Sequence, residues 1–424
     1  MIFALTVFLI TYALLLILPK YRAVVALVSA GIFIASGILS FGAAISAINF
    51  NVILMLTGTM GIVALFIESR MPSLLADLIL SKVPNVKWAI VLLALFAGLI
   101  SAFVDNVATV LMVVPVALTI SKKLNISPVP AVIAIAISSN LQGAATLVGD
   151  ATAILMGSYV GMTFSDFFFY HGKFSMFWVV QLGAVAFTLV GLFIFRKLSQ
   201  PLPEEVKKNR TQVTDYLPSV LLVGMIVLLI LFSFVPGKPE LTNGYICTGL
   251  FLIGLIAAFI RTKDNGVFLR TIKEIDVVTL LLLSGLFIVI DGITKAGVIE
   301  MVSKIFLHFS GGNVFLLYTL IVWVSVLFSA FIDNIPYVAA MLPVVSGIAA
   351  ITGMDPTLLY FGLLCGATLG GNFTPIGASA NITAIGILRK NGFEVPTLQY
   401  MKLSIPLTLA SILTGYVAIW CIWS

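Results

Sequence analysis

Charged side chains are scarce in this chain: Asp, Glu, Lys and Arg make up 9% of its 424 residues, and apolar side chains make up 61%. Soluble domains carry about 25% charged residues, so this composition excludes an ordinary soluble fold. Many apolar runs approach the length that crosses a bilayer core of about 30 Å. With a mean hydropathy of +1.18, the sequence predicts an all-α polytopic membrane protein.

Other absences remove classes of function. The three cysteines, Cys247, Cys365 and Cys421, lack the spacing of metal sites or redox pairs. Neither an HExxH motif nor a Walker-type loop occurs, which excludes a metalloprotease and, for this chain alone, an ATP-driven pump. Lys and Arg give a net charge of +6 but lie in short loops, as the positive-inside rule predicts, so we expect no nucleic-acid partner.

One long segment occurs twice. SAFVDNVATVLMVVPVALTI, from Ser101, recurs 228 positions later as SAFIDNIPYVAAMLPVVSGI, from Ser329. GAATLVGDATAI, from Gly143, and GNFTPIGASANI, from Gly371, have the same offset. The pattern indicates an internal duplication.

Charge and turn clusters divide the apolar runs into ten expected crossings and two segments that each read as a helical hairpin. The expected crossings are 2–18, 23–40, 51–67, 131–158, 174–195, 216–235, 245–260, 277–291, 356–388 and 402–422. The hairpins are 88–121 and 313–352, each turning at an Asp-Asn pair. We expect repeats at 1–196 and 216–424, joined by a cytoplasmic linker at 197–215.

The distribution of basic residues predicts the orientation. If the loop with Lys20 and Arg22 is cytoplasmic, 19 of the 23 basic residues lie inside, and the N-terminus lies outside. Five crossings and one re-entrant hairpin per repeat make the repeats inverted, because an odd number of crossings reverses the starting face. Inverted repeats with a midplane site are typical of secondary transporters. We expect a multi-pass protein of the cell inner membrane.

Asp and Asn at the hairpin turns are the first candidate site. Asp105, Asn106, Asp333 and Asn334 lie in apolar segments, where a carboxylate is costly and suggests function. Their oxygens can bind a cation, so the four residues are the candidate sodium site. They can also cap the following helix, and capping alone would suffice if each pair merely joined two crossing helices.

Two glycine-rich breaks are the second candidate site. Gly and Pro weaken a helix by about 1 and 3 kcal/mol relative to Ala, so 131–158 and 356–388 are expected to be discontinuous. An unwound backbone at membrane depth is tolerated where it lines a cavity or is buried in protein. The alternative is that the glycines serve close helix packing. The candidate ligands here are Thr146, Gly149, Asp150, Thr374, Pro375, Gly377, Ser379 and Asn381.

The candidate acids have no local counter-charge. Asp105, Asp150 and Asp333 have no Lys or Arg within their own motifs. If they share one cavity, the empty site is anionic and needs sodium ions or protons. A carried anion would then be held by helix dipoles and bound cations, because no basic residue is evident near the motifs.

The two SAF(V/I)DN segments and GGNFTPIGASANITAIG together resemble the ion transporter superfamily, over nearly the whole chain. The nearest branch holds arsenite/antimonite permeases, the P protein and D-type sodium/proton antiporters, with a citrate-transporter-like domain. The resemblance implies homodimeric carriers in which hairpins and broken helices move like an elevator. It places substrate and coupling ions at the two Asp-Asn tips and at 143–152 and 371–381.

The chain departs from this branch in the first break. Gly149 and Asp150 are followed by Ala-Thr-Ala, whereas many relatives have Pro-Pro-Asn there, so an amide ligand and two helix breakers are missing. Both tips also lack the Ser-Asn-Thr of the dicarboxylate branch, which makes a dicarboxylate substrate less favoured.

We therefore expect a cation-coupled secondary transporter of a small anion or oxyanion, neither an enzyme nor dependent on a cofactor. The coupling ion is sodium or a proton, and the expected partners are the solute, the lipid bilayer and a second copy of the chain. The alternatives are a sodium/proton antiporter and, from another class, an ion channel.

Overall fold

The computed structural model describes residues 1–208, 210–262 and 265–424, so position 209 of the expected linker lies outside the described residues. The first ten helices are α1 Ile2–Ile17, α2 Arg22–Ala35, α3 Phe41–Ala47, α4 Phe50–Glu68, α5 Met71–Leu80, α6 Val86–Ser101, α7 Asn106–Leu124, α8 Val129–Gly143, α9 Ala151–Val160 and α10 Met176–Ile194. The others are α11 Glu204–Lys207, α12 Leu217–Ser233, α13 Thr242–Thr262, α14 Asn265–Lys273, α15 Val277–Lys295, α16 Val298–Ser310, α17 Val314–Ser329, α18 Asn334–Thr352, α19 Thr357–Gly370, α20 Ser379–Lys390 and α21 Thr397–Trp423. A short hairpin pairs β1 Phe169–Tyr170 with β2 Lys173–Phe174.

The expected all-α polytopic fold is confirmed. Among the described residues, seven helices are long and apolar enough to cross a membrane, or up to nine spans if each of two bent helix pairs counts as one. The ten expected crossings do not all correspond to single straight helices in the structure. The two runs at 2–18 and 23–40 become α1 and α2, between which the chain bends by 114°. Pro19 is the cause, because it lacks an N–H group and excludes Leu18 from the helical region.

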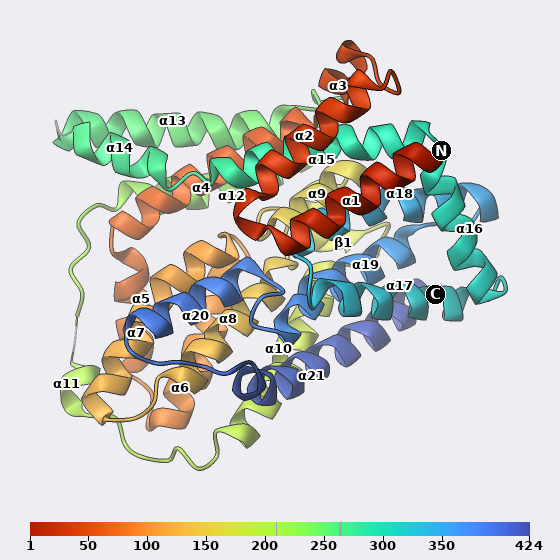
Figure 1. Ribbon diagram of the computed structural model, residues 1–424. Coiled ribbons are helices and arrows are strands. Elements are labelled where there is room, and N and C mark those ends of the chain that lie inside the picture. The colour runs from red at the N-terminus through yellow and green to blue at the C-terminus, as the bar shows by residue number, and fades with distance from the viewer. Residues whose placement is uncertain (209, 263–264) are drawn as a thin grey trace.

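Figure 1 shows the helices in two layers. The upper layer contains α2, α4, α12, α13 and α15, in which α13 packs on α4 and α2 packs on α15. The lower layer contains α6, α7, α8, α10, α17, α19, α20 and α21, in which α6 packs on α8 and α17 on α19. Helices α9 and α18 lie between the layers and pack on each other.

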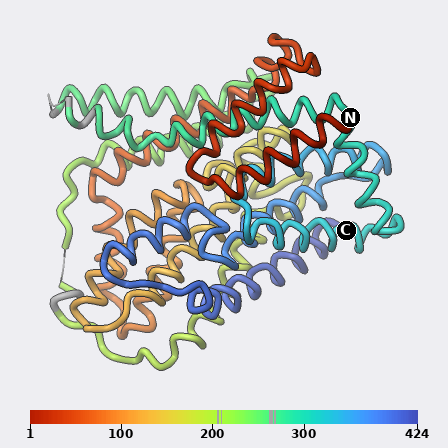
Figure 2. The backbone as a smooth tube through the Cα atoms, viewed as in Figure 1, coloured from red at the N-terminus to blue at the C-terminus, as the bar shows by residue number. Residues whose placement is uncertain are grey.

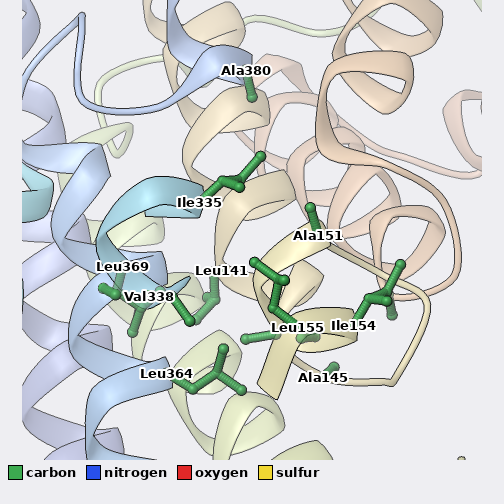
Figure 3. Packing of buried hydrophobic residues seen from close by; sticks show 14 of the residues in the cluster. Leu141, Ala145, Ala151, Ile154, Leu155, Ile335, Val338, Leu364, Leu369 and Ala380 are labelled. Atoms are coloured by element: carbon green, nitrogen blue, oxygen red, sulfur yellow. The ribbon is translucent and has the colours of Figure 1, made fainter. Parts of the chain in front are cut away.

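The apolar core lies around the two helices that precede the breaks. Every residue of α19 is buried, and so is every residue of α8 except Pro130. Figure 3 shows Leu141 of α8, Val338 of α18 and Leu364 of α19 close together in this core. Burial on all sides explains why neither helix has a charged, solvent-facing stripe.

Both ends of the expected linker at 197–215 are hydrogen-bonded to neighbouring helices. Val86 and Lys87 donate their N–H groups to the carbonyls of Gln200 and Leu198, at 2.9 and 2.8 Å. Farther along, the backbone N–H and the hydroxyl of Thr211 both reach Asp77 Oδ2 on α5, at 2.8 and 2.7 Å. The chain passes from one half to the other along the bottom and left edge of Figure 2.

Candidate functional site

The Asp-Asn turns each start a helix. Asp105 Oδ1 accepts the N–H groups of Val107 and Ala108 at 3.0 and 3.2 Å, and α7 begins at Asn106. Asp333 Oδ1 accepts the N–H of Ile335 at 3.3 Å, and α18 begins at Asn334. The expected capping role is therefore present at both turns. Each cap uses only Oδ1, so the second carboxylate oxygen can serve another partner.

The glycine-rich breaks pack directly against the hairpin turns. A methyl group at Gly149 would lie 2.6 Å from the carbonyl oxygen of Gly143 and 2.8 Å from that of Ala102. At the matching position, a methyl group on Gly377 would lie 2.7 Å from the carbonyl oxygen of Ala330. The backbone can approach this closely only because both positions lack a side chain.

Two threonines fix the same contact. Thr146 donates its hydroxyl hydrogen to the carbonyl of Ala102, and Thr374 does so to the carbonyl of Ala330. The two donor threonines are 228 positions apart, and so are the two acceptor alanines, as in the sequence repeat. These threonines, with Gly149 and Gly377, attach each break to its own hairpin.

An asparagine network joins the two breaks. Asn140 on α8 accepts a hydrogen bond from Asn106 at 2.9 Å. Its own amide donates to Asn372 at 2.6 Å and to Asn381 at 3.1 Å. Asn381 in turn donates to the carbonyls of Gly371 and Thr374, which closes the second break. A residue of the first half thus holds the unwound segment of the second.

Asp150 lies at the centre of the arrangement, with 5% of its surface exposed. Its Oδ2 accepts the hydroxyl hydrogen of Thr152 at 2.8 Å and the amide of Asn334 at 3.3 Å. The carboxylate therefore contacts the hairpin tip of the opposite half. The altered sequence after Asp150 does not displace this acid from the site.

Several of these polar side chains line one cavity of about 140 Å³. Its polar lining includes Asp105, Asn106, Asn140, Asp150, Asn334 and Ser379, together with Glu274 and Asp276 from the segment before α15. Among the described residues, no Lys or Arg lines it. Asn106 Oδ1 is buried and has no hydrogen-bond partner in the described part of the chain. A buried amide oxygen among carboxylates is a site at which a cation would satisfy an unmet hydrogen-bond acceptor.

Four helices begin at this cavity, and their first turns differ. Asp105 and Asp333 cap α7 and α18. In contrast, α9 and α20 have no side-chain cap, and their first-turn residues Ala151 and Ser379 line the cavity. Figure 3 shows Ala151, Ile335 and Ala380 at the starts of α9, α18 and α20. Uncapped N-terminal N–H groups are suited to an anion.

The expectation that no basic residue lies near the motifs is wrong. Arg22, the first residue of α2, places Nη1 2.7 Å from Asp333 Oδ2. The same oxygen accepts the hydroxyl hydrogen of Ser379 at 3.1 Å. Because 311 positions separate Arg22 from Asp333, no local pattern indicates this pair.

The structure thus separates the predicted site residues into two groups. The residues that line the cavity are Asp105, Asn106, Asp150, Asn334 and Ser379. The residues outside its lining are Asp333, Thr146, Gly149, Thr374, Pro375, Gly377 and Asn381. Sequence reasoning missed Arg22, Asn140 and Thr279, which also lines the cavity. Polarity within the buried run of α8 is the one signal that could have indicated Asn140.

The sequence matches the family CitMHS, described as citrate transporter, over residues 12–366. A 46 kDa membrane protein of Mycobacterium leprae is 31% identical, with 99% of this chain and 98% of that protein covered. An uncharacterized transporter of Mycobacterium tuberculosis is 29% identical at the same coverage. The human P protein is 27% identical over 87% of this chain, which spans 53% of that protein.

Two solved structures have a similar fold. The YdaH transporter of Alcanivorax borkumensis superposes with a TM-score of 0.58 at 15% identity, covering 86% of this chain and 84% of that one. MtrF of Neisseria gonorrhoeae, from a structural study of antimetabolite efflux pumps, gives a TM-score of 0.55 at 17% identity, covering 88% and 80%. At these identities the likeness concerns the fold alone.

Proposed function

The chain belongs to the CitMHS citrate transporter family, and is thus a membrane secondary transporter; we propose that it couples transport of a small anion or oxyanion to a cation. Sodium or a proton is the coupling ion in this proposal. The lower layer, together with α9 and α18, carries the hairpins and breaks and would move against the upper layer in an elevator-type cycle.

The acidic cavity is the observation that carries the proposal. Asp105 and Asp150 line it with Glu274 and Asp276, and none of the described Lys or Arg residues lies in its lining. Asp150 is buried and Asp105 is half-buried, whereas Glu274 and Asp276 are exposed. Carboxylates shielded from water, such as Asp150, are stable only when they are neutralised or paired. A sodium ion between Asp105, Asp150 and the free Oδ1 of Asn106 would supply the missing charge, and protons on the carboxylates would do the same.

The anion would be held by backbone rather than by basic side chains. The N-termini of α9 and α20 carry no side-chain cap at the cavity, so their N–H groups and helix dipoles are free to face a negative solute. Such a site is favourable only while the coupling cation is bound, because the neighbouring acids otherwise repel the anion. Cation and solute would therefore bind together.

Transport in proteoliposomes tests the proposal. Purified protein is given citrate, arsenite or phosphate under an inward sodium gradient, an inward proton gradient or neither. We expect uptake of one of these solutes to need one of the gradients and to disappear in Asp105→Asn. Asp291→Asn is the matched control, because Asp291 pairs with Lys295 away from this cavity. Equal uptake without any gradient would contradict cation coupling.

Sodium/proton antiport is the second candidate, and the same acidic lining favours it. In that case the carboxylates would exchange the two cations and no anion would be carried. A pH-sensitive dye inside the vesicles distinguishes the two functions. Sodium-driven proton movement with no added solute would identify the antiporter and count against the anion transporter.

We further propose that the protein works as a homodimer in the cell inner membrane, with its N-terminus outside. After replacement of Cys247, Cys365 and Cys421 by Ser, a single cysteine at position 2 should react with an impermeant maleimide on intact cells. Labelling only after permeabilisation would reverse the orientation. Chemical crosslinking of membranes before extraction would report the dimer.

A further inference from the structure

The carboxylate of Asp333 is already neutralised within the chain. Its Oδ2 lies 2.7 Å from Arg22 Nη1 and accepts the hydroxyl hydrogen of Ser379 at 3.1 Å. Its Oδ1 accepts the backbone N–H of Ile335. A guanidinium, a hydroxyl and a backbone amide thus surround the group that the sequence assigns to a mobile cation. Charge-assisted hydrogen bonds of this kind are among the strongest in proteins.

Arg22 is also fixed from its other side. Nη2 donates to Thr279 Oγ1 at 3.2 Å and lies 3.9 Å from Asp276 Oδ2. Asp276 itself caps α15 through the N–H of Thr279. The exposed fractions of the Arg22 and Asp333 side chains are 21% and 17%, so the pair is partly shielded from solvent. The guanidinium is therefore held in place rather than mobile.

The matching acid, Asp105, has no such partner. None of the ion pairs between described residues includes Asp105, whose cap occupies Oδ1. Two equivalent helix crossings identify the position in the other half that matches Arg22. A methyl group on Gly285 would overlap the backbone of Ala26, and a methyl group on Gly58 would overlap the backbone of Cys247.

Gly58 and Gly285 lie 227 positions apart and occupy equivalent crossings, α4 on α13 and α15 on α2. The equivalence relates Ala26 to Cys247, an offset of 247 − 26 = 221. The same offset relates Arg22 to Asn243, which is uncharged. Asn243 lines a different cavity, together with Asn49. One half thus supplies its own cation, whereas the other half has a neutral side chain at the matching position.

We infer that Arg22 is a built-in cation that occupies Asp333, so that the exchangeable cation is confined to the side of the cavity with Asp105, Asn106 and Asp150. The inference rests on the cation coupling proposed above and specifies its site. The chain then binds one coupling cation in place of the two that a symmetric pair of tips would bind.

Carbodiimide labelling of the full chain in proteoliposomes tests this. The reagent adds to accessible carboxyl groups in apolar surroundings, and peptide mapping by mass spectrometry identifies each labelled aspartate. We expect Asp333 to react slowly in the wild type and about tenfold faster in Arg22→Gln, because the guanidinium no longer covers its oxygen. The matched control, Lys20→Gln, removes an exposed charge two positions away and should leave Asp333 slow.

Sodium and pH are varied in the same experiment. Labelling of Asp333 at the same rate in the wild type and Arg22→Gln would overturn the inference. If the variant does not fold, the wild type alone decides: labelling of Asp333 that sodium suppresses would show a mobile cation there and would overturn it. Failure of the proposed function is read separately, as uptake that needs neither a sodium gradient nor a proton gradient, because carbodiimide labelling of any carboxyl group varies with pH.

Discussion

Replacing Asn140 by Ala should lower the free energy of unfolding more than replacing a surface asparagine by Ala does. The substitution removes the hydrogen bonds that Asn140 makes with Asn106, Asn372 and Asn381. In membrane proteins such a side-chain bond contributes about 0.6 kcal/mol on average and about 1.7 kcal/mol at most. Three of them therefore predict a loss of about 2 to 5 kcal/mol in the free energy of unfolding.

The measurement is equilibrium unfolding in mixed detergent and lipid micelles. Asn391→Ala is the control, since Asn391 is exposed after α20 and bonds only locally to the carbonyl of Ile387. That variant should remain within about 0.5 kcal/mol of the wild type. Because Asn140 connects the two breaks, Asn140→Ala should also slow transport.

A double-mutant cycle makes the reasoning refutable. Asn140→Ala and Asn381→Ala remove the same hydrogen bond, so their effects should sum to more than the effect of the double variant. If Asn140→Ala is no less stable than Asn391→Ala, or if the two effects simply add, the network does not hold the breaks together.

Two further substitutions test the close approach of the breaks and the contact between α1 and α18. Gly149→Ala should lower the melting temperature and the transport rate, because its methyl group would overlap backbone oxygens. The control, Gly386→Ala, has open space around it and should be neutral or stabilising by up to about 1 kcal/mol. Thermal unfolding of both variants measures this, and equal shifts in melting temperature would contradict it. Tyr12 on α1 donates to the carbonyl of Pro336 on α18 at 2.7 Å. If α18 moves relative to α1 during transport, Tyr12→Phe should cost about 1 kcal/mol of stability yet keep the initial transport rate. A loss of transport would mean that the bond persists through the cycle.

Local chemistry made much of the architecture predictable. Asp105 and Asp333 start helices because a short carboxylate caps the first turn, and this depends only on neighbouring residues. Glycine at 149 and 377 marks a break because glycine weakens a helix, which is also a local effect. Pro19 was a local signal for the bend after α1, although the two apolar runs by themselves suggested two separate crossings.

The sequence by itself determined the class of protein, the hairpin turns, the breaks and the acids, because hydropathy, capping and helix breaking act over a few residues. Only the tertiary structure decided which groups meet: Arg22 with Asp333, Asp150 with Asn334, and Asn140 with Asn381. These partners are 311, 184 and 241 positions apart. Their contact follows from how the buried helices pack, and packing leaves no periodic signal in the chain.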